Sequence, residues 1–329
     1  MSKTPKSMIV GTGTGIPEKV LTNKDFEKIV DTSDEWITSR TGMKVRHIAE
    51  DGQLTSDICA EAGQNALNDA GLTAKDLDTI IVATITGDVG FPSTACFVQE
   101  KLGAVNAAAM DIGAACSGFI YALDLADSMI AAGKAENVLI IGAETLSRIT
   151  DYTDRATCVL FGDGAGAAVM RPAVDNRGVL GTFIKSDGRL HHLLYMPGLG
   201  TKYPPSVDTI NQRYHYIKMA GREVFKYAVT AMGEAAEKII DIAGIESKDI
   251  DLLIPHQANL RIIDATARRI KIPSERVYVN IEKYGNTSAA SIPIAFAEAR
   301  QEGRLKEGDL VVFVAFGAGF TWGSAAIRL

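Results

Sequence analysis

The chain contains few cysteines, and their spacing excludes two classes of scaffold. Four cysteines, Cys59, Cys96, Cys116 and Cys158, are scattered along 329 residues without a C-x-x-C pair. This spacing argues against a zinc knuckle and against a disulfide framework. Unpaired cysteines fit a reducing compartment, so we expect a cytoplasmic protein.

Long apolar runs and an excess of positive charge are also missing. No run reaches the roughly 18 apolar residues that a membrane-spanning helix requires. The formal net charge is -6 at pH 7, which argues against general binding to nucleic acid. We therefore expect neither a membrane nor a nucleic acid as partner.

A complete dinucleotide-binding loop is absent as well. Residues 11–15 read Gly-Thr-Gly-Thr-Gly after a short predicted strand. However, Ile16 stands where the third glycine of G-x-G-x-x-G belongs, and Pro17 follows where a helix should run. The sequence therefore does not predict an NAD site.

An internal repeat divides the chain into two halves. Hydrophobic residues make up 47% of the chain, and its length suits two similar halves around a large core. Residues 70–81 match residues 243–254 at an offset of 173, and the same offset carries the apolar run 138–141 onto 311–314. We infer two pseudo-twofold-related α/β halves, residues 1–172 and 173–329, each with a mostly parallel sheet covered by helices.

The turn around Cys116 is the strongest candidate for chemistry in the first half. The apolar run 107–112 predicts a buried strand, and the run 119–132 predicts a buried helix that ends at Gly133. This places Cys116 at or near a helix start, where unpaired N–H groups lower the pKa of a thiol. A lone buried cysteine is more often only a small apolar side chain, so the hypothesis needs partners.

The second half supplies these partners. His256 follows the predicted strand 252–254, at the strand end where ligands of parallel sheets gather, and it can exchange a proton there. Asn286 precedes an apolar helix, and the offset of 173 places that loop opposite Cys116. Small residues at 317–319 would let backbone N–H groups approach an oxyanion. A cysteine, a histidine and an asparagine are thus expected to converge between the halves.

The chain resembles the β-ketoacyl-[acyl-carrier-protein] synthase III family over essentially its whole length. This family comprises the initiating condensing enzymes of bacterial type II fatty acid synthesis. The resemblance rests on residues 115–118 (Ala-Cys-Ser-Gly), 254–259 (Ile-Pro-His-Gln-Ala-Asn), 284–290 (Tyr-Gly-Asn-Thr-Ser-Ala-Ala) and 316–323 (Phe-Gly-Ala-Gly-Phe-Thr-Trp-Gly), with support from residues 31–37 and 153–155. It implies a thiolase-like α/β fold with five layers, αβαβα.

The resemblance also implies a mechanism. Cys116 would attack the thioester of an acyl-CoA primer, with the N–H groups of Cys116 and Ala318 as the oxyanion hole. Ala318 replaces a glycine of many family members, at little cost if only its N–H is used. His256 and Asn286 would stabilise the enolate formed from malonyl-ACP as CO₂ leaves, giving a β-ketoacyl-ACP. No metal or organic cofactor is expected, and the primer chain is left open.

Further substrate and partner contacts follow from the same resemblance. For coenzyme A it implies Thr32, Trp36, Arg40 and Arg155 at the nucleotide, and Phe225, Ala258 and Asn259 along the pantetheine tunnel. Phe91 would close the acyl pocket of the neighbouring subunit in a homodimer. Gln257, Arg261, Arg268 and Arg269 would bind the acyl carrier protein; the arginines are spaced as one helix face, which suits an acidic partner or is an ordinary solvated face.

Other functions remain open at this point. A papain-like cysteine protease also uses Cys, His and Asn, but its cysteine lies near the mature N-terminus in a disulfide-containing fold. A thiolase-fold relative, such as a type III polyketide or quinolone synthase, has the same three residues with other substrates. A non-catalytic scaffold would not need all three residues intact.

Overall fold

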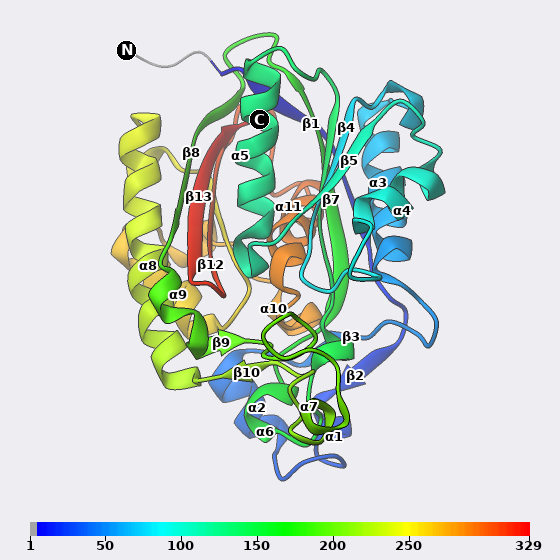
Figure 1. Ribbon diagram of the computed structural model, residues 1–329. Helices are drawn as coiled ribbons and strands as arrows, with labels where there is room; N and C mark the ends of the chain where they lie inside the picture. The colour runs from blue at the N-terminus through cyan, green and yellow to red at the C-terminus, as the bar shows by residue number, and fades with distance from the viewer. Residues whose placement is uncertain (1–4) are drawn as a thin grey trace.

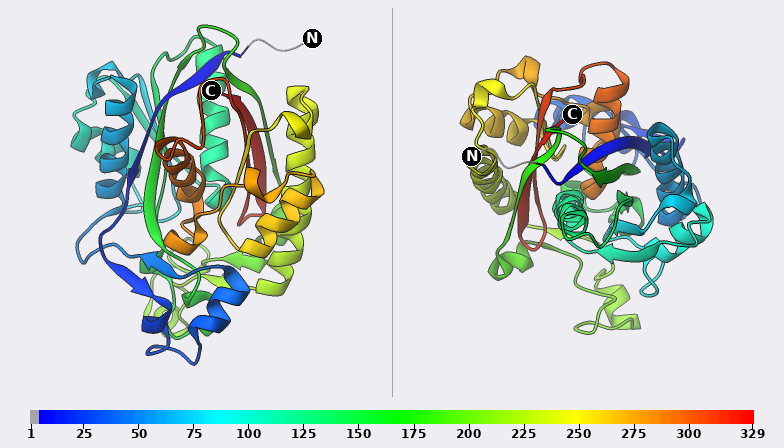
Figure 2. Two further views of the ribbon diagram at one scale, coloured as in Figure 1. Left: turned by 180° about the vertical axis from the view of Figure 1, so that it is seen from behind. Right: turned by 90° about the horizontal axis from the view of Figure 1, so that it is seen from above.

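The computed structural model describes residues 5–329 and has five layers (Figures 1 and 2). Two sheets face each other across a central pair of helices, and further helices cover the outer face of each sheet. The central helices are α5 (Gly118–Ala131) and α11 (Ser291–Gln301); the outer ones are α3 (Thr55–Ala70) and α4 (Thr94–Leu102) on one side, and α8 (Gly221–Ala243) and α9 (Leu260–Arg269) on the other. The expected αβαβα arrangement is confirmed.

The two sheets repeat one strand order. The first runs β1 (Ser7–Gly15), β7 (Asp163–Pro172), β6 (Val138–Thr145), β4 (Thr79–Ala83), β5 (Ala108–Ile112). The second, read in the same direction, runs β8 (Gly178–Ser186), β13 (Thr321–Arg328), β12 (Leu310–Gly317), β11 (Leu252–Pro255). A single bridge from Leu253 to Val277 stands where the fifth strand would lie.

The sheets are mixed, so the expectation of mostly parallel sheets is wrong. In the first sheet β4 pairs parallel with β5 and β6, but β7 pairs antiparallel with β6 and β1. In the second only β11 and β12 are parallel. The reason is that β12 and β13 are joined by a short turn rather than a crossover helix, and only a crossover permits a parallel pair.

The strand before Cys116 also differs from the expectation. β5 was expected to be buried, yet it is the edge of the first sheet, and its residues are exposed or only half-buried. An apolar run of this length does not distinguish a central strand from an edge strand that is covered in some other way.

Equivalent glycines end equivalent helices. α3 ends at Gly71 and α8 at Gly244, both with φ 65°, a left-handed conformation that favours glycine. These two positions are 173 residues apart, so the repeat found in the sequence corresponds to the same helix end in both halves.

One apolar core joins the two halves. Phe313 on β12 packs against Phe119 of α5 at 6.4 Å between ring centroids and against Phe296 of α11 at 5.1 Å. All three rings are fully buried. The central helices therefore carry apolar residues on several sides, because each of them faces a sheet in both directions.

Short elements gather at the end of the molecule below the sheets in Figure 1. They include β2 (Val20–Thr22), α1 (Asn23–Phe26), α2 (Asp34–Thr41), β3 (Val45–His47), α6 (Arg155–Cys158), β9 (Leu194–Tyr195), α7 (Val207–Asn211), β10 (Lys218–Met219) and α10 (Ile281–Tyr284). Among residues 5–329, no helix combines the length and apolar character that crossing a membrane requires.

Candidate active site

Cys116 lies in a tight turn between β5 and the start of α5. The turn is a short 3₁₀ helix, Ala115–Ser117, and Ala115 adopts φ 44° although it is not a glycine. Such left-handed alanines are uncommon and strained, and they are often found at functional sites. The prediction that Cys116 stands at the start of a buried helix is confirmed.

The second half contains the same turn. The 3₁₀ helix Ser288–Ala290 precedes α11, and Ser288 adopts φ 49°, 173 residues after Ala115. The two turns contact each other. A side chain on Gly142 of β6 would lie 2.2 Å from the carbonyl oxygen of Ala289, so only glycine permits this approach. The two equivalent turns thus meet at the centre of the molecule.

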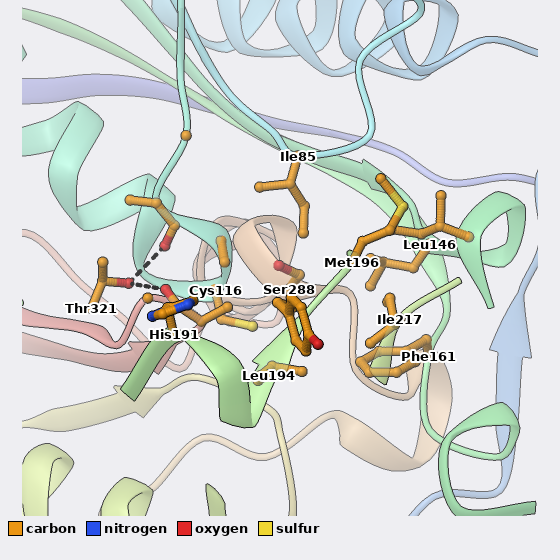
Figure 3. A pocket seen from close by; sticks show the side chains of 17 residues that line it. Ile85, Cys116, Leu146, Phe161, His191, Leu194, Met196, Ile217, Ser288 and Thr321 are labelled. Carbon is orange, nitrogen blue, oxygen red and sulfur yellow. Dashed lines mark hydrogen bonds between the residues drawn. The ribbon is translucent and has the colours of Figure 1, made fainter. Parts of the chain in front are cut away.

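Cys116 lies at the junction of two cavities. The larger, about 370 Å³, is mainly apolar (Figure 3) and is lined by Ile85, Leu146, Ile149, Phe161, Leu194, Met196 and Ile217, together with Cys116, Ser288 and Ala318. The smaller, about 130 Å³, is lined among others by Cys116, Phe225, His256, Ala258, Asn259 and Asn286. The thiol therefore faces an apolar chamber on one side and two polar partners on the other.

His256 is positioned by the end of β11 and by α11. Its N–H donates to the carbonyl of Val314 at 2.8 Å, and its ring Nδ1 lies 2.6 Å from the hydroxyl of Ser291. The side chain is 1% exposed, and this burial lowers the pKa of His256 to about 3. The imidazole is therefore neutral at pH 7, with Nε2 directed away from the bond to Ser291.

Asn286 is held by its backbone N–H and by its side-chain oxygen. Its backbone N–H donates to the carbonyl of Leu160 at 2.9 Å, and its Oδ1 accepts the N–H of Ser288 at 2.9 Å. The side chain is 8% exposed and lines the same cavity as His256. Because Oδ1 accepts the N–H of Ser288, the two N–H donors of Nδ2 are directed away from Ser288.

The thiol itself departs from the sequence-based expectation. Burial raises the pKa of the Cys116 thiol to about 12, while a hydrogen bond from Ser288 lowers it by less and the charge of Glu144 raises it further. The prediction of a lowered pKa is thus wrong. Loss of water around the sulfur is the largest influence on this pKa, because burial disfavours the charged thiolate.

The end of β12 lies directly against Cys116. A side chain on Gly317 would approach the Cys116 backbone nitrogen to 2.7 Å. Ala318 lines the larger cavity, and its carbonyl accepts the hydroxyl of Thr321 at 3.1 Å (Figure 3). The same hydroxyl also contacts the carbonyl of Ala114 at 3.0 Å, which ties the hairpin to the cysteine turn.

The expected coenzyme A residues fall into two groups. Phe225, Ala258 and Asn259 line the smaller cavity beside Cys116. Trp36 on α2 and Arg155 on α6 stack on each other, with 4.7 Å from the guanidinium carbon to the ring. The second group lies at the protein surface, since Trp36 is 36% exposed.

Thr32 and Arg40, the other two residues expected at the nucleotide, lie on either side of Trp36 in the chain. Arg40 is exposed, and its carbonyl accepts the side-chain amide of Asn259 at 2.9 Å, which connects α2 to the smaller cavity. The hydroxyl oxygen of Thr32 is buried and has no hydrogen-bond partner within residues 5–329.

Phe91 does not reach either cavity of its own chain. Its side chain is 88% exposed and precedes α4. The nearby edge strand β5 holds this region, because Asp111 accepts the N–H groups of Thr94 at 2.6 Å and Ala95 at 2.8 Å.

One expected carrier-protein residue is corrected by the structure. Gln257 is 1% exposed; its amide donates to the carbonyl of Pro255 and its oxygen accepts the N–H of Asn280. Its side chain holds the segment that carries His256 and is not available to a partner. The prediction for Gln257 is wrong, because its burial depends on segments distant in the chain, such as the one that carries Asn280.

The three arginines of α9 differ from one another. Arg261 and Arg268 are exposed, and the guanidinium of Arg261 lies 5.3 Å from the ring of Phe225. Arg269 is paired with Glu237 of α8 at 2.7 Å. Of these three arginines, Arg261 and Arg268 have no salt-bridge partner among residues 5–329.

The sequence reasoning missed three residues next to the site. Ser291 contacts His256, Ser288 contacts Cys116, and Glu144 is fully buried behind Ser288. For Glu144 a signal was available in the sequence. It follows the apolar run 138–141, and a charged side chain at the carboxyl end of a buried strand is uncommon outside functional sites.

Comparison with known proteins agrees with this geometry. Residues 110–188 match the family model described as 3-oxoacyl-[acyl-carrier-protein (ACP)] synthase III, and residues 240–329 match its C-terminal model. A β-ketoacyl-[acyl-carrier-protein] synthase III of Caldanaerobacter subterraneus subsp. tengcongensis is 54% identical over 320 residues, 97% of each chain.

Solved structures extend the comparison. The 3-oxoacyl-[acyl-carrier-protein] synthase III of Aquifex aeolicus is 51% identical, with a TM-score of 0.92 over 98% of this chain and 100% of that one. A priming β-ketosynthase from a polyketide biosynthetic pathway is 32% identical, with a TM-score of 0.91 over 100% and 98%. On these grounds the chain belongs to the β-ketoacyl-[acyl-carrier-protein] synthase III family.

Proposed function

We propose that this protein catalyses the initiating condensation of type II fatty acid synthesis. An acyl group passes from acyl-CoA to Cys116 and is then condensed with malonyl-ACP to a β-ketoacyl-ACP. The observation that carries the proposal is the convergence of Cys116, His256 and Asn286 on one cavity between the two halves.

In the first step Cys116 attacks the thioester carbonyl, CoA leaves, and an acyl-enzyme remains. The N–H groups of Cys116 and Ala318 are the proposed donors to the oxyanion, supported by the close packing of Gly317 on the cysteine turn. The larger, apolar cavity would accept the primer chain, because its lining is mostly aliphatic and aromatic.

In the second step malonyl-ACP loses CO₂ and its enolate attacks the acyl-cysteine. Neutral His256 and the free amide of Asn286 are the proposed donors to the enolate oxygen. Both are uncharged donors, whereas a carboxylate at either position would repel the developing negative charge. Each of these steps uses groups of the chain and the substrates, and we propose that no metal or organic cofactor takes part.

The substrate path is proposed from the surface to Cys116. Trp36 and Arg155 would separate to enclose the adenine, with Thr32 and Arg40 near the ribose and phosphates. The pantetheine arm would then pass Phe225, Ala258 and Asn259, which line the smaller cavity. A buried unpaired hydroxyl on Thr32 is the kind of group that a polar ligand satisfies.

We further propose that the protein acts as a cytoplasmic homodimer with an acyl carrier protein as partner. The exposed edge strand β5 and the exposed Phe91 support a second copy on this side, since edge strands and large apolar side chains are usually covered. The exposed Arg261 and Arg268 on α9, close to the smaller cavity, suit an acidic carrier protein.

The test is to mix the protein with acetyl-, propionyl-, butyryl- and branched acyl-CoA and to measure its intact mass. Wild type should gain one acyl group, and Cys116→Ser should gain none by thioester formation. Adding malonyl-ACP should then release the acyl group as β-ketoacyl-ACP. Loading without transfer to malonyl-ACP, but with transfer to malonyl-CoA, would favour the polyketide-type alternative. Absence of any adduct would refute the priming role.

A further inference from the structure

Arg46 is a fully buried arginine that the steps above do not use. It lies on β3, among the short elements below the sheets in Figure 1, and its exposure is 0%. Its guanidinium donates to the side-chain oxygen of Asn23 and to the backbone carbonyl of Val159, which are both neutral groups. Its Nε is also buried and has no hydrogen-bond partner within residues 5–329. A charged side chain is almost never fully buried unless an opposite charge is paired with it, so Arg46 calls for a specific role.

Stability alone does not account for an arginine at this position. Burial lowers the pKa of Arg46 to about 10, because the surrounding protein disfavours the charged form. The guanidinium carbon lies 4.9 Å from the centre of the Phe26 ring, in an apolar environment. An apolar side chain of similar length would fill this space without burying a charge. The groups to which the guanidinium donates are therefore the place to look for its role.

The bond to the carbonyl of Val159 anchors the segment that holds Asn286. The backbone N–H of Asn286 donates to the carbonyl of Leu160 at 2.9 Å, and its backbone carbonyl accepts the N–H of Gly162 at 3.0 Å. Both backbone groups of Asn286 are therefore bonded to a segment that Arg46 holds at its first residue.

The aliphatic part of Arg46 supports the same turn from another side. Gly285, directly before Asn286, adopts φ 66°. A side chain on Gly285 would lie 2.9 Å from Cγ of Arg46 and 3.0 Å from the carbonyl oxygen of Leu160. The turn thus fits closely between the arginine and residues 159–162, and a shift of either would move Asn286.

Asn23 connects the same guanidinium to the opposite end of the substrate path. Its side chain is 2% exposed, and its amide donates to Asp34 at 2.7 Å and to Thr38 at 3.1 Å. Both acceptors lie on α2, the helix that carries Trp36. Arg46 therefore stands between the helix expected at the nucleotide and the turn of Asn286.

We infer that Arg46 is a positioning residue for Asn286. By holding residues 159–162 and by packing against Gly285, it fixes the direction in which the Asn286 amide meets the enolate. Loading of Cys116 should depend on Arg46 much less, because Asn286 is not a donor in that step. The inference rests on the proposed function only in the role given to Asn286.

The first test needs no substrate. Amide hydrogen exchange is measured by mass spectrometry on peptides of wild type and of Arg46→Met, whose side chain keeps an unbranched apolar stem but donates no hydrogen bond. Peptides that cover residues 159–162 and 285–288 should exchange at least about tenfold faster in the variant. Peptides of β11, the strand that precedes His256, should exchange as in wild type.

The second test asks whether Arg46 acts through Asn286. Condensation is followed by the decay of preformed acyl-enzyme at saturating malonyl-ACP in wild type, Arg46→Met, Asn286→Ala and the double variant. Arg46→Met alone should slow condensation by about tenfold or more, since small displacements of a positioned group are costly. In the Asn286→Ala background the same substitution should change the rate by less than about twofold. Loading at saturating acyl-CoA should stay within about twofold of wild type.

Ile37 offers a matched control, because it is also fully buried and belongs to the apolar cluster around Phe26 and Val159. Ile37→Val removes one methylene group from this cluster and should lower the melting temperature slightly. Its condensation rate should remain within about twofold of wild type.

Wild-type exchange at residues 159–162 and 285–288 in Arg46→Met would overturn the inference. So would an equal loss of condensation in both backgrounds, an equal loss of loading and condensation, or the same pattern in Ile37→Val. Should Arg46→Met not fold, Arg46→Lys replaces it in both tests, because one ammonium group lacks the planar fork that reaches two separate acceptors. If wild type itself does not condense, the proposed function fails, whereas the exchange measurement still decides whether Arg46 holds the turn.

Discussion

The hydroxyl of Ser291 is expected to determine which nitrogen of His256 faces the substrate. His256 is neutral, so only one ring nitrogen carries a hydrogen. To donate to an enolate from Nε2, the ring must leave Nδ1 bare, and the Ser291 hydroxyl at 2.6 Å can donate to Nδ1 and stabilise that tautomer. Replacing Ser291 by alanine should therefore impair the second step selectively.

The size of the effect follows from the bond that is lost. A neutral hydrogen bond in a buried site contributes about 1–1.5 kcal/mol. Since about 1.4 kcal/mol corresponds to a tenfold change in rate, condensation should slow by about tenfold in Ser291→Ala. Acylation of Cys116 should remain within about twofold of wild type, because His256 is not a donor in that step.

The two steps are separable in one preparation. Acyl loading is followed by intact mass after mixing with acyl-CoA, and condensation by the decay of the preformed acyl-enzyme on addition of malonyl-ACP. Ser324→Ala is a suitable control, since Ser324 is also buried and donates to the carbonyl of Ala235 at 2.7 Å. An equal loss of both rates in Ser291→Ala, or the same pattern in Ser324→Ala, would refute the tautomer argument.

Two further changes probe the donors and the partner surface. Asn286→Asp should slow condensation by about 10²–10³, because a preorganised donor is lost and a negative charge faces the enolate, while loading by acyl-CoA is spared; comparable loss in both steps would contradict this. Arg268→Glu should raise KM for malonyl-ACP several-fold without changing that for acyl-CoA, whereas Arg269→Gln, whose parent side chain is already paired with Glu237, should have a smaller effect. Steady-state kinetics with each substrate varied separately check both expectations.

The sequence contained enough information to find the two turns but not their electrostatics. The apolar runs around Cys116 located its turn, and the offset of 173 residues located the loop of Asn286, because both halves use the same local chain geometry. The pKa of the thiol could not be obtained in this way, since it depends on how completely distant segments exclude water. Glu144 was missed for the same reason: its donors come from residues 84–86 and from Ser288, which are far apart in the chain.

The errors in the fold have a common origin. Residues 317–319 were interpreted only as a possible oxyanion segment, although Gly317 and Thr321 are the paired ends of the β12–β13 hairpin. A hairpin reverses the chain direction, so β12 and β13 pair antiparallel and the second sheet is mixed. The alternation of predicted strands and helices had indicated parallel pairs instead. The edge position of β5 was equally hidden, because an apolar edge strand and a central strand have similar compositions.

The meeting of Ala115 and Ser288 at the pseudo-twofold axis has a consequence for how such a chain can change over time. Two copies of one strained turn lie back to back, yet only one of them carries a thiol, and Ala289 stands at the equivalent position of the other. The turn at Ser288–Ala290 therefore does not have to hold a nucleophile. Its side chains can differ from those of the first turn and interact with Cys116 instead. Substitutions in the C-terminal half are then able to retune a reaction that takes place on a sulfur atom of the N-terminal half, without touching the residue that carries it.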